Sequence, residues 1–268
     1  MSATVSGAAD RQAAPRRGAG LVWHQIRYEQ LTFWRNPQSA FFTFVFPILI
    51  IVIFGGLFGG AEDSSFYYGG NALQYYVSTI AGMSVLSACY SQLAIVLATR
   101  RQNGILKRVR ATPLPASVYF VGLLAHCVLV SFVDVLLILV VGRFYGLELP
   151  AASQWLPLVV SLALGAAAFC ALGIAIASLI RNADAAPAVV QFILFPLLII
   201  SGTYVPIHGV IDTISGMLPV KPLNDALLTA FTSHTAGFRW HDCLTLLVWG
   251  VIASAVGIRR FRWDPRPE

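Results

Sequence analysis

Residues 100–115, RRQNGILKRVRATPLP, form a short basic segment between two long apolar runs. Gly104 permits a sharp turn near its start, and Pro113 and Pro115 stop a helix at its end. Three apolar residues share one face at helical spacing: Ile105, Leu106 and Val109. The pattern predicts a short amphipathic helix in a water-exposed loop at residues 99–115. A solvated basic loop would explain the arginines but not the apolar face, and the residues alone leave both interpretations open.

The composition of the whole chain is typical of a membrane protein. Of its 268 residues, 57% are hydrophobic and 11% are charged, whereas soluble domains contain about 25% charged residues. The net charge of +6 therefore indicates Lys and Arg gathered in loops on one side of a membrane, and no nucleic-acid partner is expected. The four cysteines are scattered through the chain, so we expect neither a disulfide framework nor a metal site.

Six apolar runs are candidates for membrane spans, which need about 20 residues each. They are residues 40–59, 72–98, 116–141, 155–180, 187–201 and 242–258. The expected fold class is an all-α membrane protein, with a six-span transmembrane domain at residues 40–260. The fifth run is short, so it either continues beyond residue 201 or ends as a re-entrant element buried in protein.

The distribution of basic residues orients these spans. With both termini cytoplasmic, all 18 Lys and Arg residues lie on the cytoplasmic side except Arg143, Lys221 and Arg239, as the positive-inside rule requires. No apolar segment follows the first arginines, so we expect the first span to act as the insertion signal in place of a cleavable signal peptide. We therefore expect a multi-pass protein of the inner cell membrane.

Two segments that flank the spans have patterns of their own. Residues 21–38 predict an amphipathic helix on the cytoplasmic membrane surface, after a disordered tail at residues 1–20; a disordered juxtamembrane segment is the alternative. Its apolar face comprises Val22, Trp23, Ile26, Phe33 and Trp34. Tryptophan together with arginine suits the depth of the lipid head groups. Residues 261–268 predict a second cytoplasmic tail.

The long segment at residues 202–241 is divided by glycine and proline. Two apolar pieces within it, residues 210–218 and 223–231, have helical spacing but are too short to cross a membrane. We expect an outer re-entrant or half-inserted segment that packs on the bundle, because backbone at membrane depth must have its polar groups satisfied.

The basic loop also resembles a known motif. In membrane subunits of type-2 ABC exporters, the coupling-helix loop reads roughly Arg-Glu-x-Gly-x-Leu-basic-x-apolar and then Thr-Pro, a pattern that this chain follows from Arg101 to Pro113. The six-span layout, the helix before the first span and the SGTYVP turn at residues 201–206 resemble the same family. Gln102 departs from the pattern, because it stands where the family usually has Glu. A neutral amide cannot make the ionic contact to the ATPase that this Glu could make.

The resemblance implies a permease subunit of the drug-, oligosaccharide- or lipid-exporting branch, which moves an amphipathic substrate out of the cytoplasm. The implied partners are two copies of an ATP-binding subunit, a second permease subunit, identical or not, and membrane lipid. ATP and Mg would be bound by the ATP-binding subunit, and this chain would bind no cofactor. The residues implied to couple to that subunit are Arg101, Gln102, Gly104, Ile105, Leu106, Lys107, Arg108 and Val109.

The residues independently indicate that this chain is not itself an ATPase. A Walker A loop needs a glycine immediately before its lysine, so that backbone amides and the lysine hold the phosphates together. The two lysines of the chain, Lys107 and Lys221, follow Leu106 and Val220.

Six residues of the spans are candidates for a substrate path: Tyr75, Tyr76, Asp134, Gln191, Phe192 and Phe195. The family's arrangement would place the second and fifth spans along a cavity between two permeases, although helix packing would equally explain their polar residues. Asp134 lies within the third span, where a carboxyl group marks a polar cavity, an ion path or a structural hydrogen bond. A proton-coupled secondary transporter that uses Asp134, and a non-transporting membrane scaffold, are the alternative functions.

Overall fold

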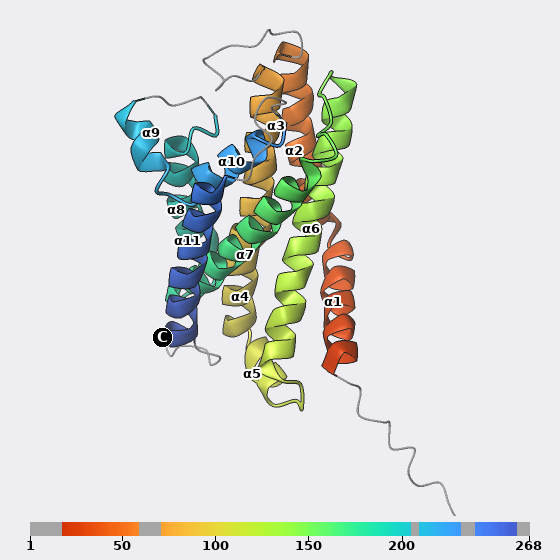
Figure 1. The fold of residues 1–268 in the computed structure, drawn as a ribbon. Helices are drawn as coiled ribbons and strands as arrows, with labels where there is room; N and C mark the ends of the chain where they lie inside the picture. The colour runs from red at the N-terminus through yellow and green to blue at the C-terminus, as the bar shows by residue number, and fades with distance from the viewer. Residues whose placement is uncertain (1–17, 59–70, 205–208, 232–238, 262–268) are drawn as a thin grey trace, which may run out of the picture.

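The computed structural model describes residues 18–58, 71–204, 209–231 and 239–261, and every element within these ranges is helical (Figure 1). The helices are α1 (Gly18–Trp34), α2 (Pro37–Phe58), α3 (Ala72–Leu86), the π-helix η2 (Ser87–Gln92), α4 (Leu93–Gln102), α5 (Ile105–Arg110), α6 (Ala116–Phe144), α7 (Trp155–Leu179), α8 (Ala186–Ile200), α9 (Val210–Ser215), α10 (Val220–Leu228) and α11 (Trp240–Arg260). The tails expected at residues 1–20 and 261–268 lie almost wholly outside the described ranges.

Among the described residues, five helices are long and apolar enough to cross a membrane. They are α2, the continuous helix Ala72–Gln102, α6, α7 and α11. The expected fifth span forms α8, which has 15 residues and therefore rises only about 22 Å, less than the roughly 30 Å of a hydrocarbon core. The structure thus supports five long spans and one short apolar helix, so the expected count of six spans is not confirmed, although the fifth run is short as expected.

The helix Ala72–Gln102, made of α3, η2 and α4, lies at the centre of the bundle. In its most apolar stretch 72% of the residues are buried, against 28–50% in the other four long helices. Asn71 begins it with a capping box, because its Oδ1 accepts from the Gln74 amide at 2.8 Å while Gln74 Oε1 accepts from the Asn71 amide at 3.2 Å. α2, α6, α7 and α10 all pack against this helix.

A glycine of α7 allows the close approach of α7 to the π-helix. A Cβ at Gly173 would lie 2.9 Å from the carbonyl oxygen of Cys89 and 3.0 Å from that of Tyr90. These are backbone atoms, which cannot rotate away as a side chain can.

We expect Gly173→Ala to lower the free energy of unfolding by about 1–3 kcal/mol, as overpacking does. Gly56→Ala is the matched control, because a Cβ at Gly56 meets nothing within 4 Å and alanine favours a helix over glycine. Thermal denaturation in detergent measures both; equal melting temperatures for the two variants would contradict this account of the α7 contact.

α1 packs lengthwise against α6 through a partly polar face (Figure 1). Gln25, Glu29 and Phe33 recur every four residues on this face and are buried, whereas Trp23 and Trp34 are 68% and 57% exposed. The expected apolar face is therefore divided, since Phe33 points toward the protein and the two tryptophans point away from it. The sequence pattern did not predict the polar inner face.

The segment expected as an outer re-entrant element contributes α9 and α10, and residues 205–208 and 232–238 of it lie outside the described ranges. α10 packs against α3, α7 and α11, and its Leu223 and Leu227 are fully buried. α9 remains largely exposed, with Val210 at 78% and Met217, just beyond its end, at 69%. Two short helices thus form where the apolar spacing predicted them, but only α10 belongs to the core.

Candidate functional site

The basic loop folds as a sharp corner between α4 and α6, at one end of the bundle (Figure 1). Gly104 occupies the left-handed region with φ of 69°, a conformation that strains any residue with a Cβ. The short helix α5 follows at once and ends at Arg110. Pro115 then precedes the first residue of α6 with φ of −59°, the value that its ring imposes. The predicted short helix therefore forms within the predicted loop.

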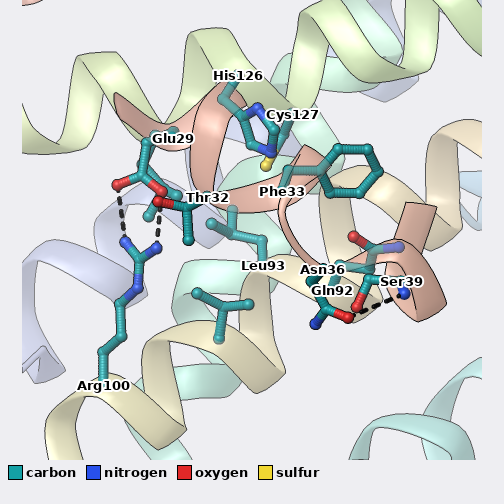
Figure 2. Close-up of a pocket in the computed structure, with 12 residues that line it drawn as sticks. Glu29, Thr32, Phe33, Asn36, Ser39, Gln92, Leu93, Arg100, His126 and Cys127 are labelled. Carbon is teal, nitrogen blue, oxygen red and sulfur yellow. Dashed lines mark hydrogen bonds and ion pairs between the residues drawn. The ribbon is translucent and has the colours of Figure 1, made fainter. Parts of the chain in front are cut away.

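Arg100, near the end of α4, joins this corner to α1. Its Nη1 donates to Glu29 Oε1 at 2.8 Å and its Nη2 donates to Glu29 Oε2 at 2.7 Å (Figure 2). Nη1 also donates to the Tyr119 hydroxyl of α6 at 2.9 Å, and Gln25 Nε2 donates to Glu29 at 3.0 Å. The side chains of Arg100 and Glu29 are only 15% and 3% exposed. A bidentate pair this buried fixes the relative positions of both helices.

The next two residues connect the corner to α7 and to the loop that follows it. Arg101 is buried and donates to the carbonyl oxygens of Ala177 at 3.0 Å and of Ile180. These carbonyls lie at the carboxyl end of α7, where no further helical turn supplies donors and a cation is favoured. Gln102 Oε1 accepts from the amide of Ala183. Three successive residues therefore fasten the corner to three separate elements.

α5 has an inner and an outer face. Leu106 is fully buried and belongs to the main hydrophobic core. Ile105 is 40% exposed, and three basic side chains are exposed beside it: Lys107, Arg108 and Arg110. The outer face is therefore basic with one apolar residue, a chemistry suited to an acidic or mixed surface of a partner.

The structure divides the residues expected to couple to a partner. Gln102, Ile105, Lys107 and Arg108 are exposed, and Gly104 and Val109 are half-buried. Arg101 and Leu106 point into this chain, where they hold α5 in place. The predicted apolar face is thus not a single contact surface, because Leu106 packs on the bundle.

The six candidates for a substrate path also fall into two groups. Tyr75 and Tyr76 are buried in α3, where the Tyr75 hydroxyl donates to the Gly202 carbonyl and Tyr76 packs on Phe54 with ring centres 4.3 Å apart. Asp134 is buried in α6. The α8 residues Gln191, Phe192 and Phe195 are exposed instead, so the described chain does not bring the six together.

The sequence analysis missed Glu29 and Tyr119. Glu29 is the only acidic residue between Asp10 and Glu62, and a carboxylate so isolated next to a span is the signal that could have drawn attention to it. Its four-residue spacing from Gln25 and Phe33 places all three on one helical face. No comparable signal distinguishes Tyr119 from the other tyrosines.

The opposite end of the bundle carries a charged cluster that joins three helices. Lys221 of α10 bonds to Asp212 of α9, and its Nζ lies 3.7 Å from Asp225 Oδ2. Arg239 Nη2 lies 3.8 Å from Asp225 Oδ2, and Arg239 Nε lies 2.5 Å from Asp242 Oδ2 of α11. The cluster ties α9, α10 and α11 together.

We expect this cluster to make the stability of the protein depend on pH. Burial raises the pKa of Asp225 to about 6, although Lys221 and Arg239 oppose the shift, while Asp242 and Asp212 add to it. Between about pH 4 and 6 the folded protein holds a proton on Asp225 that the unfolded chain has released. Stability should therefore fall as the pH rises through this window, by on the order of 2 kcal/mol.

Melting temperatures measured from pH 4.5 to 7 test this expectation. Asp225→Asn should flatten the fall, because an amide does not titrate, and the exposed Asp184→Asn serves as the control. A wild-type protein that grows more stable across this range would show that the ion pairs, and not burial, dominate at Asp225.

The fold and the corner define a class: a helical multi-pass membrane protein with a short basic helix, preceded by residues that bind α1, α6 and the end of α7. Comparison with protein families then identifies it, since the family described as ABC-2 type transporter matches residues 21–232. The chain therefore belongs to the ABC-2 type transporter family, as a non-catalytic transmembrane component of an ABC transporter. Such permeases typically work with an ATP-binding subunit. A comparison with curated proteins gave no match.

Proposed function

We propose that this chain is the permease subunit of an ATP-driven exporter, which moves an amphipathic substrate (a drug, a lipid or a glycolipid) out of the cytoplasm. It pairs with a second permease subunit, and two copies of the ATP-binding subunit bind ATP and Mg. The complex lies in the inner cell membrane with both termini of this chain in the cytoplasm. α5 is the helix that receives the movement of the ATPase.

The observation that carries this proposal is the set of contacts that holds α5 against neighbouring parts of the protein. Its outer face is basic and exposed, while the three residues just before it contact α1, the end of α7 and the loop after α7. A push on α5 therefore moves several elements together. Two packings of the bundle that differ by a few kcal/mol would then suffice for nucleotide to switch which side is open.

Charge reversal on α5 tests the proposal. The double variant Lys107→Glu, Arg108→Glu should lose co-purification of a P-loop ATPase and nucleotide-dependent transport in vesicles, since like charges placed at an interface repel. Arg143→Glu, at the exposed far end of α6, is the matched control and should keep both. Transport by the purified permease without any ATPase would overturn the proposal.

The exposed face of α8 supports the part of the proposal that concerns the substrate path. Phe192 and Phe195 are 81% and 51% exposed, on a helix whose opposite side packs into the core through Leu194 and Leu198. We place this face toward the second permease, so that the aromatic side chains of the two α8 helices flank a shared path for an amphipathic substrate.

Asp134 favours the alternative of proton coupling. It is 1% exposed, and its carboxyl group lies next to the hydroxyl of Ser84 of α3. Asp134→Asn distinguishes the two functions, because the amide matches the carboxyl group in size but cannot carry a transported proton. An ATP-driven exporter should retain transport in this variant, whereas abolished transport with intact ATPase binding would favour proton coupling.

A further inference from the structure

A small pocket lies between α1, α4 and α6, beside the Arg100–Glu29 pair that joins the α5 corner to α1 (Figure 2). Its lining includes the polar residues Asn36, Ser39, Gln92 and His126 and apolar side chains such as Phe33 and Leu93. Thr32 and Asn36 at its rim are exposed, so the pocket opens to the surroundings of the bundle.

The size of the pocket limits its occupant to a small chemical group. Its volume is about 130 Å³, room for about four waters at roughly 30 Å³ each. Sites for drug-sized ligands measure about 300–1,000 Å³. A head group of the size of glycerol fits, and a whole amphipathic drug does not.

One buried polar atom in the pocket wall lacks a partner. His126 is 9% exposed, and its Nδ1 makes no hydrogen bond within the described structure. Such a buried atom is destabilising unless a ligand or water satisfies it. Gln92 is the last residue of the π-helix, an element that is frequent at functional sites, and it reaches the same pocket.

The charges of the wall favour a head group without an ammonium. Glu29 is its only carboxylate and already accepts two hydrogen bonds from Arg100 and one from Gln25. The guanidinium of Arg100 also lines the wall and is paired with Glu29 and Tyr119. The remaining polar groups include amides, hydroxyls and an imidazole, which can exchange hydrogen bonds with hydroxyl groups.

The outer side of α1 favours an anionic lipid. Its exposed residues include His24, Arg27, Trp23 and Trp34, and the exposed Arg35 follows its last residue, whereas its one acidic residue is the buried Glu29. Arginine and tryptophan on one helix suit an interface with anionic lipid. Arg35 immediately precedes Asn36, so it lies next to the pocket rim.

We propose that this pocket binds the glycerol head group of an anionic phospholipid, with the lipid phosphate at Arg35 and the head-group hydroxyls between Asn36, Gln92 and His126. The acyl chains remain in the membrane beside α1. The site does not depend on the proposed export function, because lipid binding requires neither ATP nor a transported substrate.

Lipid titration of the purified full-length chain, followed by native mass spectrometry, tests the proposal. Phosphatidylglycerol should bind at least about tenfold more tightly than either of two control lipids, a difference of about 1.4 kcal/mol. Phosphatidic acid is anionic but has no glycerol head group, and phosphatidylethanolamine carries an ammonium. Equal binding of phosphatidylglycerol and phosphatidic acid would overturn the proposal.

Two variants locate the binding within the pocket. Ser39→Leu fills it, and Ser117→Leu, at the exposed start of α6, is the control. Asn36→Asp keeps the oxygen that accepts from the Ser39 amide at 3.3 Å and adds a negative charge next to the phosphate. Ser39→Leu and Asn36→Asp should each weaken phosphatidylglycerol binding about tenfold. Unchanged binding in Asn36→Asp would overturn the proposal even if Ser39→Leu fails to fold.

Discussion

Glu29→Ala is expected to lower the free energy of unfolding by about 3–5 kcal/mol, because it leaves the guanidinium of Arg100 buried without its counter-charge. The same substitution leaves the amide of Gln25 without its acceptor. Thermal denaturation of the detergent-purified protein measures the loss. Arg27→Ala, on the exposed side of the same helix, is the control and should change stability by no more than about 0.5 kcal/mol.

A double-mutant cycle separates the interaction energy between Glu29 and Arg100 from the effect of removing each side chain alone. Glu29→Met combined with Arg100→Met should recover much of the loss, since replacing a whole buried ion pair by apolar residues is often neutral or stabilising. The two single variants should therefore be non-additive by more than about 1 kcal/mol. Additive losses would show that Glu29 and Arg100 do not interact in the folded protein.

The ends of the long helices could be predicted because apolar length and proline are local signals. The run expected at residues 116–141 forms α6 at Ala116–Phe144, and Pro115 sets its start in both accounts. The run expected at residues 187–201 likewise forms α8 at Ala186–Ile200, which ends just before the turn where Gly202 has φ of 74°. The short apolar run therefore predicted the length of α8 correctly, whereas the count of six spans is not confirmed.

The inner fastening of the α5 corner could not be predicted, because it depends on contacts between distant residues. Arg100 and Glu29 lie 71 residues apart, and Arg101 and Ala177 lie 76 apart. The basic residues of the loop predict an exposed, positively charged segment, but the pattern does not say which arginines point inward. Only the docking of α1 and α7 decides that Arg100 and Arg101 bind the protein while Lys107 and Arg108 stay exposed.

Two neighbouring residues of α5 should give opposite results. Leu106→Ala is expected to lower the free energy of unfolding by about 2–5 kcal/mol, because the truncation leaves a cavity at a fully buried position. Ile105→Ala should cost under about 1 kcal/mol, since its side chain is 40% exposed. The melting temperatures of the two variants in detergent give this comparison directly.

If the proposed function holds, the same two variants should also differ in how tightly they bind the ATPase. Ile105→Ala should weaken co-purification of the ATPase about tenfold or more, as expected where a single apolar side chain anchors an interface. Leu106→Ala should retain binding at temperatures where the variant is still folded, because its side chain does not reach the outer face. If Ile105→Ala kept full binding while the Lys107 and Arg108 reversal lost it, the contact with the ATPase would be electrostatic, and α5 would transmit force through its charges alone.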